Sequence, residues 1–113
     1  MSAKSMIIAA VAAFASTVVA KSGDMTYYAP GLGACGIVSD DGQPVVALNS
    51  ADYAGGANCG RWISINANGQ KVAAQVVDLC PGCGAGGLDV SSTVFGFIAP
   101  LSEGRVNVDW TFE

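Results

Sequence analysis

The sixteen residues VVDLCPGCGAGGLDVS (residues 76–91) contain the features that decide the fold. They begin as an apolar strand that ends at Asp78, cross a loop with four glycines, and reach Asp89 before a second apolar segment. Glycine has no Cβ, so a glycine-rich loop lets two backbones lie close together. We therefore expect Asp78 at the rim of its sheet, and Asp89 where a shallow groove can hold its carboxylate.

Each of these two aspartates also has a structural interpretation. Asp78 suits a turn residue that accepts backbone N–H groups from the Cys80–Cys83 loop. Asp89, together with Ser91, suits a cap on a helix that begins at Ser92. The residue pattern favours the structural role for Asp78 and leaves Asp89 open between a cap and a binding site.

Outside this stretch, short β segments are separated by turns rich in Gly, Asp and Asn. Residues 66–69, with the sequence NANG, predict a hairpin. Trp62 shares one face of its segment with the polar Ser64 and Asn66, which predicts that this face is exposed. We expect strands at residues 25–28, 45–48, 61–67, 71–79 and 105–112.

Two segments have helical character. Residues 49–53 can form one turn, and residues 91–99 predict a short helix with a Ser at its N-cap and Pro100 beyond its end. A chain of strands with one or two short helices predicts a mainly β fold. In a domain of about 93 residues we expect a closed barrel, because closure removes the free sheet edges that lead to aggregation.

The N-terminus has the three parts of a signal peptide. Lys4 supplies the positive charge, residues 6–14 form an apolar run, and small residues lead to a cleavage site after Ala20. A membrane anchor or a helix of the fold is the alternative. It is disfavoured because the uncharged stretch is short and rich in Ala, Ser and Thr. We predict a signal peptide at residues 1–20, a secreted protein, and one domain at residues 21–113.

The charge balance excludes two classes of partner. Beyond residue 20 the chain has four basic and nine acidic residues, a net charge of about −5. Nucleic acids and anionic membranes both require clustered Lys and Arg, so we expect neither. The few charges and many glycines suit a neutral polysaccharide. We expect a monomer without a cofactor.

The four cysteines stand at positions 35, 59, 80 and 83. In an oxidising compartment they predict two disulfides, for which three pairings are possible. A zinc site is the alternative, because Cys80 and Cys83 have ligand-like spacing. It is disfavoured by the single CxxC pair and the lack of histidine. A redox CxxC motif is also disfavoured, since no βαβ pattern surrounds it. We expect no metal.

Seven short motifs make the chain recognisable. In order, they are TYY (26–28), GACG (33–36), VALN (46–49), CG (59–60), VDLCP (77–81), GLDVS (87–91) and GRVNVDW (104–110). From about Gly23 to Phe112, the chain resembles the RlpA-like double-psi β-barrel superfamily, a six-stranded barrel shared by expansins, rare lipoprotein A, barwin-like proteins and family forty-five endoglucanases. Within it, the chain most resembles the single-domain fungal expansin-like proteins called loosenins.

The resemblance implies roles for particular residues. The aspartate of the GLDVS motif, Asp89, would lie in a polysaccharide groove, with Thr26 and Tyr28 facing the same groove. Asp78 would lie in the neighbouring psi loop and shape the site. The resemblance also implies the pairings Cys35–Cys59 and Cys80–Cys83.

The chain departs from the related endoglucanases, which use an acid and a base roughly 6.5–9.5 Å apart. Their base follows the first strand, where this chain has Ala29 and Pro30. Asp24 is a nearby carboxylate, but we expect it on the wrong side of the strand. Hydrolysis would then lack its second carboxylate.

Aromatic residues are the usual means of stacking on a sugar ring. Trp62 is our candidate for this role, because it shares a face with polar residues. Tyr27 and Tyr28 point to opposite faces of their strand, so only one of them can face the groove. Trp110 and Phe112 are expected to fill the core.

Three functions fit these features. The leading hypothesis is a secreted, non-hydrolytic, expansin-like protein that binds and loosens cellulose or chitin. The second is an inhibitor of papain-type cysteine proteases, or a secreted effector, that acts through loops such as residues 49–58. The third is a lytic enzyme on cell-wall glycans that resembles rare lipoprotein A. We favour a protein that is not an enzyme.

Overall fold

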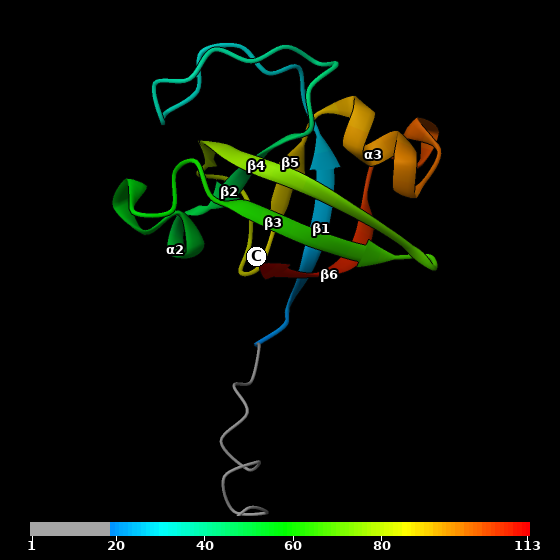
Figure 1. Ribbon diagram of the computed structural model, residues 1–113. Coiled ribbons are helices and arrows are strands. Elements are labelled where there is room, and N and C mark those ends of the chain that lie inside the picture. The colour runs from blue at the N-terminus through cyan, green and yellow to red at the C-terminus, as the bar shows by residue number, and fades with distance from the viewer. Residues whose placement is uncertain (1–18) are drawn as a thin grey trace, which may run out of the picture.

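The computed structural model describes residues 19–113 (Figure 1). The predicted signal peptide lies almost entirely outside the described residues. The strands are β1 (Lys21–Tyr27), β2 (Val45–Asn49), β3 (Trp62–Ala67), β4 (Gln70–Cys80), β5 (Leu88–Val90) and β6 (Val106–Phe112). The helices are α2 (Ser50–Tyr53) and α3 (Ser92–Ile98), with 3₁₀ turns η1 (Ala54–Gly56) and η2 (Leu101–Glu103).

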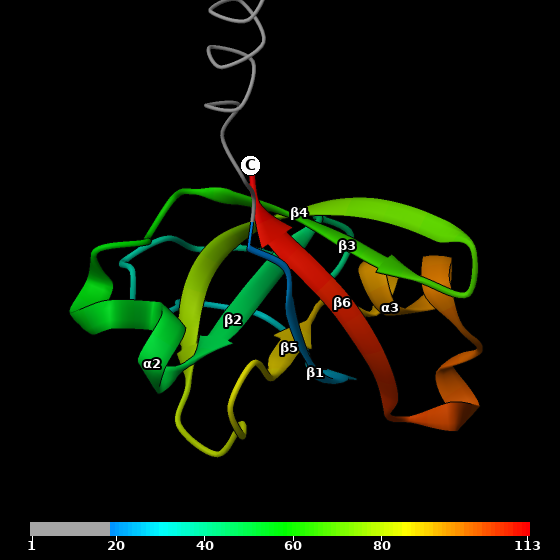
Figure 2. The same ribbon diagram turned by 90° about the horizontal axis from the view of Figure 1, so that it is seen from below.

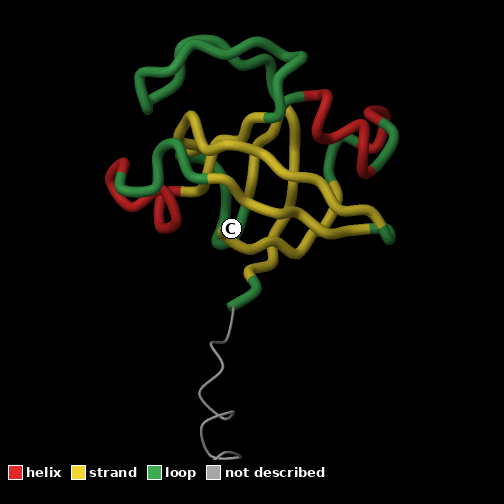
Figure 3. Tube along the Cα trace, viewed as in Figure 1, coloured by secondary structure: helices red, strands yellow, loops and turns green. Residues whose placement is uncertain are grey.

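The six strands close into a barrel in the order β1-β5-β2-β4-β3-β6, with β6 returning to β1 (Figures 2 and 3). Two of the pairings are parallel, β1 with β5 and β2 with β4. In Figures 1 and 2, α2 and α3 lie at opposite sides of the barrel. The predicted mainly β barrel with two short helices is confirmed. The sequence pattern missed β5, because three residues are too few to show a period.

The core fills the barrel with inward-facing apolar side chains. Trp110, Phe95 and Met25 are among its largest fully buried members. Each large apolar side chain buried in this way contributes about 1.5–3 kcal/mol. Trp110 is in the core as predicted, and Phe112 packs against it from a partly buried position.

The glycine-rich loop packs directly onto β1, as the sequence indicates. A Cβ on Gly23 would collide with the carbonyl of Gly86, and a Cβ on Gly86 would collide with the carbonyl of Ser22. Gly86 also has a φ of +70°, which other residues rarely adopt. Its carbonyl accepts a hydrogen bond from Trp110 Nε1 at 2.9 Å. The loop is thereby fixed beside the first strand.

The NANG hairpin is confirmed as the β3–β4 connection. Ala67 pairs with Gln70, and Asn68 and Gly69 both have positive φ angles, as a type I′ turn requires. One prediction about β3 is wrong: Ser64 is buried although Trp62 and Asn66 on the same face are exposed. Ser64 is small and lies at the middle of β3, paired with β4 on one side and β6 on the other.

Helix α3 is capped differently from the sequence prediction. Ser91 occupies the N-cap position, but its hydroxyl donates to the carbonyl of Gln43. The backbone N–H of Ser92 instead donates to Asp41 Oδ1 at 2.8 Å. The Ser92 hydroxyl also donates to Asp41, and this side-chain bond, followed by the backbone bond, lowers the pKa of Asp41. The capping carboxylate therefore comes from a distant loop, and Asp89 is not a cap.

Both predicted disulfides are present, Cys35–Cys59 and Cys80–Cys83. They use all four cysteines, which removes the zinc alternative. Across residues 19–113, no group of three or more His, Cys, Asp or Glu side chains has an arrangement suited to a metal ion. In the same part of the chain, none of the helices combines the length and apolar character needed to span a membrane.

Candidate functional site

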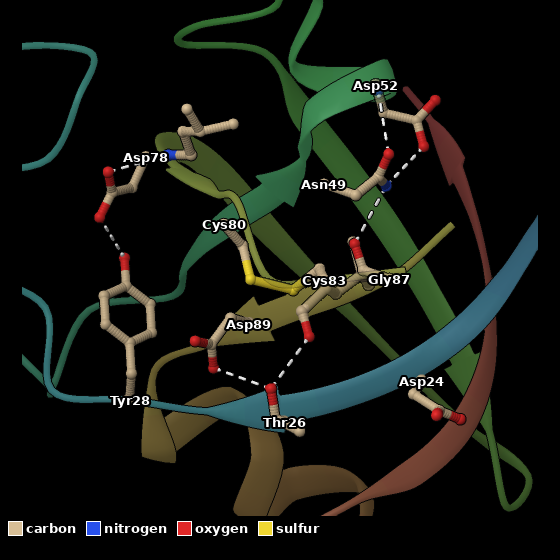
Figure 4. Close-up of a disulfide and its surroundings, with 12 residues drawn as sticks. Asp24, Thr26, Tyr28, Asn49, Asp52, Asp78, Cys80, Cys83, Gly87 and Asp89 are labelled. Carbon is tan, nitrogen blue, oxygen red and sulfur yellow. Dashed lines mark hydrogen bonds between the residues drawn. A yellow bond between two sulfur atoms is a disulfide. The ribbon is translucent and has the colours of Figure 1, made fainter. Parts of the chain in front are cut away.

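The site begins with the register of two parallel strands. β1 pairs with β5 so that Thr26 lies opposite Asp89. The Thr26 hydroxyl donates to Asp89 Oδ1 at 3.0 Å and lies 3.4 Å from the carbonyl oxygen of Leu88 (Figure 4). Thr26 and Asp89 are 63 residues apart in sequence and meet because β1 and β5 pair in the barrel. We call the surface around Thr26, Tyr28, Asp78 and Asp89 the groove, after the groove that the family resemblance implies.

Backbone N–H groups hold the carboxylate of Asp78 in place. Its Oδ1 accepts N–H bonds from Ala34 at 2.7 Å and from Leu79 at 2.8 Å. The β2–β4 register skips Val77, so β4 contains a bulge just before Asp78, and bulges re-aim the side chains beside them. The prediction that Asp78 bonds to the Cys80–Cys83 loop is wrong, since its backbone donors are Leu79, the next residue, and Ala34, in the loop after β1.

Tyr28 is hydrogen-bonded to Asp78, and the charge of Asp89 also acts on it. Its hydroxyl donates to Asp78 Oδ2 at 3.3 Å (Figure 4). Burial raises the pKa of Tyr28 well above its ordinary value, and the neighbouring Asp78 carboxylate raises it further. The phenol is therefore protonated at all physiological pH values and acts as a hydrogen-bond donor. Tyr27 points away and packs against Phe95, as the strand alternation predicts.

The environment of Asp89 disfavours its charged form. Burial raises the pKa of Asp89, the Thr26 hydrogen bond opposes this shift, and the charge of Asp78 adds to it. A carboxylate that is partly desolvated and bonded on one oxygen binds a new donor strongly, because it has already lost part of its water shell.

A pocket of about 180 Å³ continues the site beyond Thr26. Asp24 and Arg105 lie on one side of it, and Arg105 Nη1 lies 3.2 Å from Asp24 Oδ2. Asp24 precedes Thr26 by two residues on β1 and lines the same pocket, whereas Asp89 lies on the neighbouring strand β5 (Figure 4). The prediction that Asp24 lies on the wrong side is therefore wrong. The other lining residues are Cys80, Gly82, Cys83, Gly84, Ala85 and Gly87.

Trp62 does not join this cluster. It is 40% exposed, as predicted. However, its strand β3 lies opposite β5 in the barrel order, with β2 and β4 between them on one side and β6 and β1 on the other. Trp62 and Asp89 therefore belong to opposite walls. The structure thus brings together Thr26, Tyr28, Asp78 and Asp89, and leaves Trp62 apart.

Two pocket residues were not found by sequence reasoning. Asp24 had a usable signal, because residues two apart on a strand share a face and Asp24 precedes Thr26 by two. Arg105 had none, since it comes from the opposite end of the chain and reaches β1 only through the β1–β6 pairing.

The chain has relatives among known proteins, both by sequence and by structure. No protein-family model matches the chain. It is 35% identical over 100 residues to a papain inhibitor of Streptomyces mobaraensis, covering 80% of this chain and 70% of the inhibitor. It is 34% identical over 96 residues to Allergen Asp f 7 of Aspergillus fumigatus, covering 80% of this chain and 36% of the allergen. An EG45-like domain containing protein of Citrus jambhiri is 28% identical, with 89% and 88% covered.

The solved structures that share this fold include an expansin and a papain inhibitor. An Asp-to-Asn mutant of an expansin from Clavibacter michiganensis, in complex with cellohexaose, superposes with a TM-score of 0.78 at 25% identity, covering 84% of this chain and 50% of the expansin. A Streptomyces papain inhibitor superposes with a TM-score of 0.75 at 32% identity, covering 83% and 94%. The chain thus spans about half of that expansin and about a third of the allergen.

The closed six-strand barrel and these similarities define an expansin-like domain. The chain belongs to the RlpA-like double-psi β-barrel superfamily.

Proposed function

We propose that the protein is secreted, binds cell-wall polysaccharide (cellulose or chitin) in the groove around Asp89, and loosens its packing without cleaving it. The observation that carries this proposal is the Thr26–Asp89 pair, which presents a partly desolvated carboxylate at 3.0 Å from its orienting hydroxyl. Secretion is supported by the predicted signal peptide and by two disulfides, which persist in oxidising compartments.

Asp89 would bind the glycan through its second oxygen. Thr26 holds Oδ1, and Oδ2 would accept a hydroxyl group from a sugar. A hydrogen bond to a charged group contributes about 1.5–3 kcal/mol. Bonds of this strength can replace the hydroxyl–hydroxyl bonds between neighbouring polymer chains, which loosens the packing. The complex of a related expansin with cellohexaose supports a glycan as the ligand.

The other carboxylates near the groove are engaged, which supports the absence of hydrolysis. Asp78 accepts two backbone N–H bonds and the Tyr28 hydroxyl. Asp24 forms an ion pair with Arg105. An inverting glycosidase needs a second carboxylate that is available to activate water. These bonds support the proposal that neither Asp78 nor Asp24 serves as such a base.

The proposal is tested by two readouts on the same samples. Purified protein is incubated with filter paper and with chitin, and both swelling and released reducing sugar are measured. We expect swelling without sugar release, and loss of swelling in Asp89→Asn. Abundant sugar release that Asp89→Asn abolishes would show a lytic enzyme instead.

We also propose a second function, inhibition of papain-type cysteine proteases. It is favoured by the papain inhibitor, of which this chain covers 94% in the structural comparison. It is also favoured by what we call the loop face, residues 29–44 and 50–60, which the Cys35–Cys59 disulfide ties together. There Leu32 and Val38 form a β-bridge and are 75% and 74% exposed. Exposed aliphatic side chains on a braced loop suit insertion into a protease cleft.

Titration of papain separates the two functions. If the loop face inhibits, Asp89→Asn inhibits as strongly as the unmodified protein, because Asp89 lies outside the loop face. Loss of inhibition in Asp89→Asn would contradict this assignment, and an absence of inhibition in the unmodified protein would remove the second function.

A further inference from the structure

The loop face contains a short two-stranded segment, residues 31–33 and 37–39, which we call the ribbon. In it, Leu32 pairs with Val38 as an isolated antiparallel bridge. Both hydrogen bonds of the bridge join the residues beside this pair, so Leu32 and Val38 are a non-hydrogen-bonded pair. The N–H and C=O groups of such a pair point away from each other. The two bonds are Gly33 N–H to the Ile37 carbonyl at 3.0 Å and Ser39 N–H to the Gly31 carbonyl at 2.9 Å.

These outward groups give the ribbon two free edges. The strands β1–β6 pair with one another in a closed barrel. By contrast, within residues 19–113 no backbone group bonds to the N–H or the C=O of Leu32 or Val38. A free edge is a template for an added strand. The ribbon can therefore receive an extended polypeptide through backbone hydrogen bonds.

The two faces of the ribbon differ. On the inner face, Gly33 lies so close to β4 that a Cβ would collide with the Val77 carbonyl. On the outer face, the side chains of Leu32 and Val38 point into solvent and are 75% and 74% exposed. Residues 29–39 carry no charge. The outer face is thus aliphatic and uncharged, and it is narrow because glycines stand on both sides of Leu32.

The ribbon is held in place before any partner binds. At its turn, the Ala34 N–H donates to Asp78 Oδ1 at 2.7 Å and the Cys35 N–H donates to the Val77 carbonyl at 3.2 Å. The Cys35–Cys59 disulfide fixes the same turn to the second segment of the loop face. An edge that is already ordered loses little conformational entropy when it binds. These bonds would also keep both new ends in place if a peptide bond of the ribbon were cut.

We propose that the ribbon binds papain-type cysteine proteases by edge pairing. One of its strands takes the place of an extended substrate strand in the protease cleft, and the side chains of Leu32 and Val38 contact the cleft walls. A protease holds its substrate as an extended strand through backbone hydrogen bonds, so its cleft offers the partners that a free edge lacks. This inference rests on the proposed inhibition of such proteases and names the surface and the mode of contact. Inhibition is then competitive with a peptide substrate.

Proline substitutions test the backbone pairing directly. Leu32→Pro and Val38→Pro each remove one outward N–H that no backbone group of residues 19–113 accepts, and each keeps an apolar side chain. Proline is tolerated in a strand where the N–H faces solvent. Inhibition constants for papain are measured against a peptide substrate. We expect competitive inhibition by the unmodified protein and a loss of roughly tenfold or more in the variant whose strand enters the cleft.

Matched variants separate the backbone from the side chains. Leu32→Met and Val38→Ile keep both the N–H and an aliphatic side chain, and they should inhibit within about threefold of the unmodified protein. Melting temperatures and the mass of the disulfide-linked peptides show whether each variant folds.

Amide hydrogen exchange of the unmodified protein gives a second measurement that needs no substitution. The N–H of Leu32 or of Val38 should exchange fast in the free protein and slowly in the complex with papain, because strand pairing protects amide groups.

Three results overturn the inference, and they are distinguishable. If the unmodified protein inhibits papain, but both proline variants match their controls and neither amide is protected, the ribbon is not the contact and the proposed inhibition stands. If the unmodified protein does not inhibit papain, the proposed inhibition fails and the inference fails with it. If size-exclusion chromatography shows a dimer that the proline variants lose while their inhibition is unchanged, the edge pairs with a second copy of this chain and the assigned partner is wrong.

Discussion

The groove and the loop face are built on the same barrel by different means. In the groove, Thr26 and Asp89 come from paired strands, so strand register fixes their spacing. In the loop face, residues 29–44 and 50–60 lie outside the strands β1–β6, and the Cys35–Cys59 disulfide holds them (Figure 3). Groups on strands are positioned more precisely than groups on loops. The difference suits a groove for a repetitive polymer and a loop face that can vary with its partner.

Asp78 connects the two regions. One of its oxygens accepts the Ala34 N–H at the base of the loop face, and the other accepts the Tyr28 hydroxyl beside the groove. Gly33 packs so closely on β4 at this point that a Cβ would collide with the Val77 carbonyl. The loop face is thus anchored to the same strand that borders the groove.

The largest expected effect comes from the disulfides. Cys35–Cys59 closes a loop with a sequence separation of 24, and Cys80–Cys83 one with a separation of 3. Loop-closure entropy predicts that Cys35→Ser/Cys59→Ser lowers the free energy of unfolding by about 3.5 kcal/mol, and Cys80→Ser/Cys83→Ser by about 2 kcal/mol. Urea unfolding of the two double variants gives both values. The reverse ranking would contradict the loop-closure explanation.

Weakening the connection between the groove and the loop face, at Asp78, should have the next largest effect on the free energy of unfolding. Asp78→Asn replaces a carboxylate that accepts two backbone N–H groups and a phenol. We expect the free energy of unfolding to fall by about 1–3 kcal/mol, because charge-assisted bonds to these donors weaken. Glu103→Gln, at an exposed acidic position, is the control and should change it little. Equal stability of both variants would show that Asp78 does not anchor the loop.

The loop face can be tested without disturbing the groove. Leu32→Ser/Val38→Ser changes two exposed side chains, so stability should change by no more than about 0.5 kcal/mol. Papain inhibition should weaken about tenfold, since aliphatic anchors at an interface contribute at this level. Measured inhibition constants provide the readout. Unchanged inhibition would place the protease contact elsewhere.

The smallest expected effect is a pH-dependent gain in stability in Asp89→Asn. Burial raises the pKa of Asp89 above its ordinary value near 3.8. The folded protein therefore holds this proton more tightly than the unfolded chain, and stability falls as pH rises from about 3.8 through the raised pKa. The Asp89→Asn variant has no carboxyl group at this position, so its stability does not fall in this way as pH rises.

Melting temperatures at two pH values measure this gain. Asp89→Asn should melt above the unmodified protein at neutral pH, and the difference should shrink below pH 3.8, where Asp89 is protonated in both states. A variant that melts lower at neutral pH would indicate a structural role for the Asp89 carboxylate.

Local sequence patterns predicted the elements that have local causes. The NANG turn predicted the β3–β4 hairpin, and apolar runs, alternation and turn residues together located five of the six strands. The family resemblance gave the cysteine pairing and the Thr26–Asp89 proximity. What was missed depends on strand order around the barrel. Trp62 was our candidate for stacking on a sugar ring, and the structure places its strand β3 on the wall opposite β5 and Asp89, a separation that no local pattern encodes.

The cap of α3 was missed for a similar reason. Ser91 stands at the expected position, yet Asp41 supplies the capping carboxylate from a loop 51 residues earlier in the chain. Local preference identified the helix start correctly, and tertiary contacts decided which side chain caps it.

The central claim, that the groove around Asp89 binds cell-wall polysaccharide, is tested most directly by co-sedimentation with insoluble cellulose and chitin. The unmodified protein, Asp89→Asn and the Leu32→Ser/Val38→Ser variant are compared at equal concentration. We predict that the unmodified protein and the loop variant sediment with at least one polymer, and that Asp89→Asn remains in the supernatant. Sedimentation of Asp89→Asn to the same extent as the unmodified protein would contradict the account.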